Sequence, residues 1–320
     1  MVRFYLICIC WYASSAVTNS IGKVILSQFK YPVTMTLIQF AFVSLFSFLY
    51  SSVFSKLQPP TLHIIRNTFP IAAFQITGHI LSTNALTYIS VAFSHTIKAL
   101  SPLFTAFLYK VLYNVNHSMN VYMALLLLTS GVVLVCASNL KFNLIGFLCS
   151  LGSTFIFVLQ NIVSKKIFNE AALSQMTTRK IDKINMMFYA NSIALMIIFP
   201  IWFYAEGWSL LLTNELPSVH LLFLLLLKGL THFCQSILAF SILAMCSPIT
   251  YSIASLVKRI FVITASIIYF ADAVGFIQAS GIALTFTGLY LYQRAKREVA
   301  TAEMQAADRM TSELPRSYKP

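Results

Sequence analysis

Charge is scarce in this chain, and negative charge is the scarcer kind. Only 10% of the 320 residues are charged, against 58% that are hydrophobic, and 22 lysines and arginines stand against nine aspartates and glutamates. Soluble domains carry about 25% charged residues. A mean hydropathy of +0.78 leaves too little polar surface for a soluble enzyme. The composition favours helices that cross a lipid bilayer, each of which needs about 20 apolar residues.

Motifs for metal binding and covalent catalysis are also missing. The six cysteines lie in apolar stretches and form no CxxC pair, so neither a disulfide framework nor a zinc site is indicated. The sequence contains no HExxH, GxSxG or P-loop motif and no carboxylate pair. We therefore expect no enzyme, no cofactor and no catalytic residue. Nothing implies a nucleic-acid partner or an obligatory protein partner.

Long hydrophobic runs fill the chain instead. Ten segments are separated by short polar breaks and by one longer basic break at 166–184. They lie at 4–26, 32–54, 68–88, 91–113, 119–138, 142–165, 185–205, 217–241, 248–271 and 275–293. This pattern predicts an all-α membrane protein with ten transmembrane helices, followed by a charged tail at 294–320 that we expect to be disordered.

The distribution of positive charge predicts the orientation. If the N-terminus is cytosolic, the termini and the cytosolic loops hold fifteen of the 22 cations. The opposite side then holds only Lys30 and Lys141. Cytosolic loops carry the excess of lysine and arginine in membrane proteins, so both termini are expected in the cytosol.

The remaining five cations lie inside the predicted spans, where no carboxylate accompanies them. They are Lys23, Lys98, Lys228, Lys258 and Arg259. A cation at the centre of a spanning helix costs about 2.5–3.5 kcal/mol on the scale derived from membrane-insertion experiments, which gives the lowest values. Lys23 lies near a span end and is expected to snorkel. For the mid-span cations we expect a water-filled cavity that receives an anion, and the alternative is a structural cation paired with backbone carbonyls.

A weak internal repeat predicts the architecture. The fourth and ninth spans each carry a hydroxyl residue three or four positions before a mid-span cation, Ser94 before Lys98 and Ser255 before Lys258 and Arg259. Residues 1–140 and 141–293 then form two five-helix halves. An odd number of spans gives the halves opposite orientations, which is the inverted-repeat plan of secondary transporters with a site near the midplane.

Helical spacing places polar residues on shared faces. Lys228, His232 and Gln235 align on the eighth span, His79 and Ser82 on the third, and Tyr251 aligns with Lys258 on the ninth. Each histidine taken alone is more commonly a packing residue. Taken together, the substrate-binding candidates are Lys98, Lys258, Arg259, His79, Ser82, Lys228, His232, Gln235 and Tyr251.

Several of these residues stand in runs that resemble the triose-phosphate/phosphate translocator family of the drug/metabolite transporter superfamily. The similar runs are Gly78-His79, Ser94-His95-Thr96-Ile97-Lys98 and, most specifically, Lys258-Arg259-Ile260-Phe261-Val262-Ile263. The resemblance implies exchange of a phosphorylated metabolite for inorganic phosphate. It places the family's phosphate-binding lysine on Lys98, its Lys-Arg pair on Lys258 and Arg259, and its histidine and hydroxyl residue on His79 and Ser82.

Departures from the plastid pattern fall at the other end of the implied site. Gln160 stands where plastid members carry an arginine, and Cys234 or Gln235 stands near the position of a substrate-contacting tyrosine. The pattern is similar to the fungal branch, which implies a Golgi or endoplasmic reticulum membrane. We expect Lys228 to meet a substrate carboxylate, with Gln160 opposite. This favours phosphoenolpyruvate or 3-phosphoglycerate over triose phosphate.

Two other functions remain open at this point. One is a nucleotide-sugar transporter of the same superfamily, which the adjacent Lys258-Arg259 pair disfavours. The other is a non-transporting membrane factor in vesicle traffic, which gives no reason for cations at mid-span.

Overall fold

The described residues of the computed structural model form a bundle of helices without a strand. They are residues 2–54, 59–138, 142–173, 183–213, 217–245 and 248–313. The helices are α1 (Val2–Gln28), α2 (Pro32–Phe54), α3 (Leu62–Tyr88), α4 (Val91–Lys98), α5 (Ser101–Tyr113), α6 (Met119–Ser138), α7 (Leu144–Leu173), α8 (Lys183–Trp202), the π-helix η1 (Phe203–Gly207), α9 (Trp208–Thr213), α10 (Val219–Met245), α11 (Pro248–Phe270) and α12 (Phe276–Glu313).

Eight stretches within these ranges are long and apolar enough to cross a membrane. They are 3–28, 32–54, 91–113, 119–138, 144–164, 184–212, 219–239 and 253–270. The spans predicted at 68–88 and 275–293 are helical, in α3 and α12, but are not among these eight. Both helices contain polar residues, which lowers their mean hydropathy.

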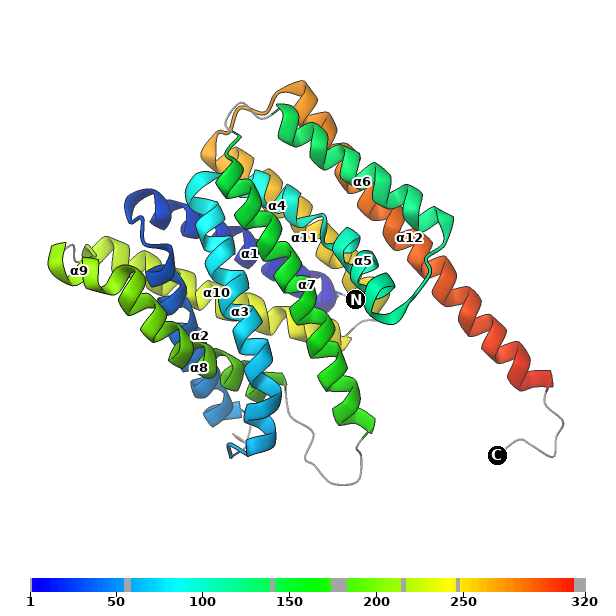
Figure 1. Cartoon of the computed structure of the whole chain (residues 1–320), viewed down its shortest axis with the longest axis horizontal. Helices are drawn as coiled ribbons and strands as arrows, with labels where there is room; N and C mark the ends of the chain where they lie inside the picture. The colour runs from blue at the N-terminus through cyan, green and yellow to red at the C-terminus, as the bar shows by residue number, and fades with distance from the viewer. Residues whose placement is uncertain are drawn as a thin grey trace.

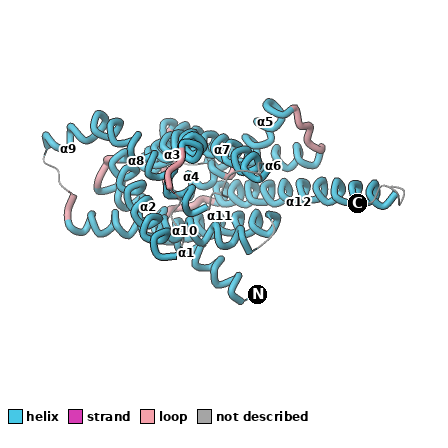
Figure 2. The backbone as a smooth tube through the Cα atoms, turned by 90° about the horizontal axis from the view of Figure 1, so that it is seen from below, coloured by secondary structure: helices cyan, strands magenta, loops and turns pink. Residues whose placement is uncertain are grey.

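The end of α12 differs from the expectation for the tail. The helix continues to Glu313, into the region 294–320 that the sequence indicated as disordered. Alanine, glutamate, arginine and methionine, all strong helix formers, are frequent there. Residues 314–320 lie outside the described residues. In Figures 1 and 2 this helix extends well past the rest of the bundle.

The single span predicted at 91–113 is interrupted in its middle. Helix α4 starts after Ser90, whose hydroxyl accepts a hydrogen bond from the Phe93 amide at 3.3 Å, and it ends at Lys98. Helix α5 then starts at Ser101 with Pro102 in its first turn. Proline lacks an amide donor and fits the first turn of a helix, but not its interior. The interruption places the C-terminal end of α4, and with it Lys98, inside the bundle.

The helices pack in pairs that are distant in sequence. Helix α1 packs against α10, α2 against α8, α3 against α7, α4 against α11, and α6 against α12. The α6–α12 pair lies along one side of the bundle in Figure 1. Glycines bring these two helices into close contact: a Cβ atom on Gly131 would lie 2.5 Å from the Thr285 nitrogen, and one on Gly288 would lie 2.4 Å from the Leu128 nitrogen.

A buried carboxylate in η1, directly after α8, binds the start of α2. The two oxygens of Glu206 accept hydrogen bonds from the amides of Val33 and Thr34, at 2.9 and 2.6 Å, and from the Thr34 hydroxyl at 2.7 Å. The Trp202 indole donates to the same hydroxyl oxygen at 2.8 Å. A carboxylate at a helix N-terminus satisfies free amides and interacts favourably with the helix dipole. The negative charge of Glu206 is therefore used within the fold.

The close contact between α6 and α12 leads to a stability prediction. Gly288→Ala places a methyl group against the backbone of α6, so the pair must separate, at a cost of about 1–3 kcal/mol. We expect a lower melting temperature for the purified protein in detergent. Gly275→Ala is the matched control, because nothing lies within 4 Å of its added Cβ. Equal melting temperatures for the two variants would contradict the close packing.

Candidate functional site

A polar cavity of about 620 Å³ lies among α1, α2, α3, α7, α8, α10 and α11. The residues with polar side chains that line it are Trp11, Gln75, His79, Gln160, Asn161, Ser164, Asn191, His232, Gln235, Ser236, Tyr251 and Lys258. The described part of its wall contains no carboxylate.

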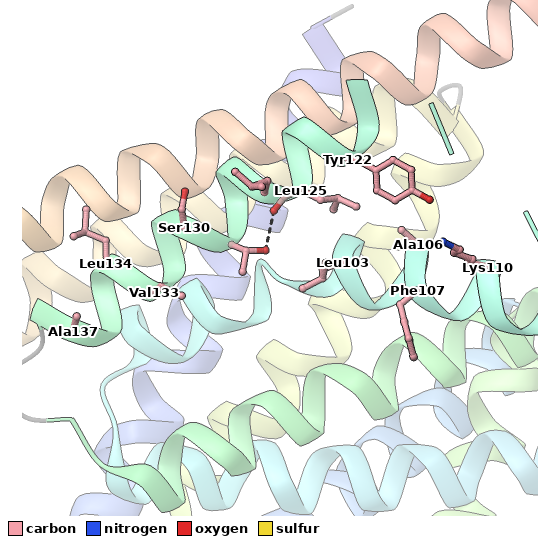
Figure 3. Close-up of a pocket in the computed structure, with 12 residues that line it drawn as sticks. Leu103, Ala106, Phe107, Lys110, Tyr122, Leu125, Ser130, Val133, Leu134 and Ala137 are labelled. Carbon is pink, nitrogen blue, oxygen red and sulfur yellow. Dashed lines mark hydrogen bonds between the residues drawn. The ribbon is translucent and has the colours of Figure 1, made fainter. Parts of the chain in front are cut away.

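A second, larger hollow has a different character. The groove of about 850 Å³ between α5 and α6 is lined almost wholly by apolar side chains. Figure 3 shows Lys110 and Tyr122 near one end of it and Ala137 at the other. Its one cation, Lys110, lies 5.9 Å from the centre of the Tyr122 ring. The groove has no set of converging polar groups, so we place the candidate site in the smaller polar cavity.

Lys258 reaches the polar cavity across an aromatic platform. Its Nζ lies 4.4 Å from the centre of the Trp11 ring, which stacks on Tyr251 with centroids 5.6 Å apart. A cation over an indole face gains about 0.5–2 kcal/mol, depending on how far it is desolvated. The platform draws α1 and α11 together. It stabilises the lysine without neutralising it.

Lys98 and Arg259 meet at the interruption between α4 and α5. The Lys98 ammonium donates to Ser82 Oγ at 2.6 Å, and Ser82 lies one helical turn beyond His79 on α3. Arg259 Nη1 donates to the Lys98 carbonyl at 2.6 Å, and Nη2 donates to Ser101 Oγ at 3.3 Å. The last carbonyls of a helix lack partners within the helix and attract cations. The end of α4 therefore holds the Arg259 guanidinium in place.

Uncharged groups thus accept hydrogen bonds from these cations or pack against them. The positive charge of the cations is not neutralised. Among the described residues the ion pair found is an exposed one, between Arg294 and Glu298 at 3.1 Å, and none involves Lys98, Lys258 or Arg259. Several cavity atoms are also buried without a hydrogen bond to any described residue: Trp11 Nε1, Gln160 Oε1 and Gln235 Oε1. Buried polar atoms normally have partners. The cations and these unpartnered atoms together suit an anionic ligand that also carries hydrogen-bonding groups.

Comparison with known proteins agrees with this geometry. Residues 2–293 match the profile of the Triose-phosphate Transporter family. The chain belongs to this family. A Schizosaccharomyces pombe protein named as a transporter, C83.11, is 44% identical, over 92% of this chain and 67% of that protein. "Phosphoenolpyruvate/phosphate translocator 3, chloroplastic" of Oryza sativa subsp. japonica is 30% identical, over 90% of this chain and 73% of that protein.

Two further matches concern a second yeast and the fold. "Uncharacterized transporter SLY41" of Saccharomyces cerevisiae is 29% identical, over 92% of this chain and 80% of that protein. A crystal structure superposes with a TM-score of 0.56 at 11% identity, over 93% of this chain and 97% of that one. The last match shows a shared fold alone.

The structure of this transporter divides the nine candidate residues into three groups. His79, His232, Gln235, Tyr251 and Lys258 line the cavity. Lys98, Ser82 and Arg259 form the hydrogen-bonded group at the α4–α5 interruption. Lys228 does not line the cavity: it is 6% exposed, and its Nζ donates to Gln39 Oε1 at 2.7 Å.

Other residues at the candidate site make contacts that the sequence pattern did not indicate. Trp11 lies in an apolar run, and nothing in the sequence marks it as the partner of Lys258. Gln39 is a polar residue in the middle of a hydrophobic span, and its position there could have marked it as a candidate. Lys23 Nζ donates to the carbonyls of Leu86 and Ile89, at 2.6 and 2.9 Å, at the end of α3.

Proposed function

We propose that this protein exchanges a phosphorylated C3-type metabolite for inorganic phosphate across a Golgi or endoplasmic reticulum membrane, by alternating access. The observation that carries the proposal is the set of uncompensated cations, Lys98, Lys258 and Arg259, beside a polar cavity without a carboxylate in its described wall. Membership of the Triose-phosphate Transporter family supports it. The name of the Oryza sativa relative, a phosphoenolpyruvate/phosphate translocator, also supports it.

The phosphate group is assigned to the three cations. Arginine presents a planar fork of donors that matches phosphate oxygens, and lysine acts as a point charge. Arg259 is held by the end of α4, and Lys258 rests on Trp11, so neither side chain needs to be ordered when an anion arrives. Lys98 with Ser82, and His79 one turn away, would supply further donors.

The carbon skeleton is assigned to the rest of the wall. Gln160, His232, Gln235 and Tyr251 line the cavity. Gln160 Oε1 and Gln235 Oε1 are buried acceptors without a described partner, which suits a substrate that offers a hydroxyl donor. Among the expected substrates this feature favours 3-phosphoglycerate or triose phosphate, and a substrate panel would rank them.

Alternating access is supported by the way the helices pair. If 1–140 and 141–293 are inverted repeats, a two-fold axis exchanges the α1–α10 pair with the α3–α7 pair. It maps the α2–α8, α4–α11 and α6–α12 pairs onto themselves. All of these pairs pack, as do α2–α10 and α3–α8, which the same axis exchanges. Lys98 and Arg259 come from opposite halves, so an anion between them would draw the halves together and couple binding to closure.

Loss of Lys258 should impair exchange far more than loss of a cation elsewhere. Lys258→Gln removes a charge-assisted contact, worth about 1.5–3 kcal/mol, and should lower kcat/KM for phosphate exchange roughly 10- to 100-fold. Lys110→Gln, in the apolar groove, removes the same charge at another place and should leave exchange unchanged. Labelled phosphate uptake into liposomes containing purified protein measures both. Equal losses in the two variants would show that overall charge matters and the site does not.

Exchange should be obligatory. Occluding the empty site would desolvate three uncompensated cations, at an effective cost of several kcal/mol per ion, and a bound phosphate would offset much of that cost. The carrier should therefore reorient readily when loaded and rarely when empty. Liposomes preloaded with phosphate should accumulate labelled substrate, whereas liposomes without internal phosphate should not. Similar initial rates in the two preparations would contradict the electrostatic argument.

A further inference from the structure

Lys228 is buried and is not among the residues that line the cavity. It is 6% exposed, and its stem passes over α1 at Gly22, where an added Cβ would lie 3.2 Å from the lysine Cε. Its ammonium donates to Gln39 Oε1 on α2 at 2.7 Å. A buried cation held by a neutral amide is an unusual arrangement, so the role of the amide needs an explanation.

The position of Lys228 fixes which way the Gln39 amide faces. A lysine ammonium can only donate hydrogen bonds, so the amide oxygen of Gln39 must face it. The amide NH₂ group then faces α3, where Gln39 Nε2 lies 3.2 Å from His79 Nδ1. An amide orientation of this kind follows from the network of donors and acceptors around it. From α10 to α3 the groups therefore follow in the order Lys228 ammonium, Gln39 amide oxygen, Gln39 amide nitrogen and His79 imidazole.

This order also sets the tautomer of His79. The Gln39 NH₂ group donates, so His79 Nδ1 must accept and carries no proton. The single proton of the neutral ring is then on Nε2. The ring is packed edge-to-face against Phe40 and Phe157, at 5.4 and 5.3 Å between centroids, and it lines the cavity. Nε2 makes no hydrogen bond to any residue in the described ranges.

We propose that Lys228 and Gln39 are positioning residues that hold His79 as an Nε2–H donor for an acceptor oxygen of the phosphorylated substrate. The inference rests on the proposed function for the identity of the ligand. Lys228 acts through two intermediate groups and never touches the substrate. Hydrogen bonds from neighbouring side chains orient ligand-binding histidines in the same way in metal sites.

Gln39→Glu tests this directly because the side chain keeps its shape. One carboxylate oxygen still accepts from Lys228, but the other can no longer donate to His79. The ring must then place a proton on Nδ1, which leaves Nε2 of a neutral ring as an acceptor. We expect kcat/KM for phosphate exchange in liposomes to fall roughly 10- to 100-fold, the loss typical of a hydrogen bond to a charged group.

Nitrogen NMR of the histidine side chains provides a readout that is independent of transport. With ¹⁵N-labelled histidine and a His79→Gln sample to assign the signal, the wild-type ring should carry its proton on Nε2, and the ring in Gln39→Glu should carry it on Nδ1. This measurement needs no substrate. It therefore tests the tautomer even if the wild-type protein proves not to exchange phosphate, an outcome that would reject the proposed function alone.

A double-mutant cycle separates positioning from general damage. In His79→Gln the side-chain amide offers an N–H donor that does not depend on Gln39, so adding Gln39→Glu should cause little further loss. Three results would overturn the proposal: a wild-type proton on Nδ1, loss of the Nε2 proton without loss of exchange, or the same fold-loss from Gln39→Glu in both backgrounds.

Discussion

The structure depends on positive charge that no carboxylate of the described residues neutralises. Lys98, Lys258 and Arg259 are held by a serine hydroxyl, an indole face and the carbonyl end of α4. These neutral partners reduce the cost of desolvation without removing the charge. Glu206, which is buried, instead caps α2. The site is thereby left with a charge that an anion can satisfy, and this links the composition of the chain to its transport activity.

The interruption between α4 and α5 makes the arrangement possible. An uninterrupted span over 91–113 would satisfy its own carbonyls and offer nothing to Arg259. Because α4 ends at Lys98, its C-terminal carbonyl binds the guanidinium, and the hydroxyl of Ser101 at the start of α5 binds it too. The C-terminal end of α4 therefore carries Lys98 and, together with the start of α5, binds Arg259. A secondary transporter commonly places its site at such a broken helix near the midplane.

Hydrophobic periodicity predicted the helical class and helices in all ten predicted ranges, of which eight stretches are long and apolar enough to cross a membrane. The family followed instead from the resemblance of runs such as Lys258-Arg259-Ile260. The mid-span cations and the resemblance together pointed to His79, Lys98, Lys258 and Arg259; the structure places His79 and Lys258 on the cavity wall and Lys98 and Arg259 at the α4–α5 interruption. Three features were beyond the sequence pattern. The interruption at Ala99 and Leu100 lies in a run that reads as continuous. The direction of Lys228 depends on α2, and the spacing within α10 says nothing about it. The Trp11 platform arises from contact between helices 240 residues apart in sequence, Trp11 to Tyr251.

The most direct test of the uncompensated charge is the thermal stability of the purified protein as a function of phosphate. A ligand that binds only the folded state stabilises it by about 2.7 kcal/mol at 100 times its dissociation constant. We expect the melting temperature to rise with inorganic phosphate relative to chloride at equal ionic strength. The rise should persist in Lys110→Gln and disappear in Arg259→Ala. A melting temperature that responds equally to phosphate and chloride would contradict the account, because the cations would then show no preference for phosphate.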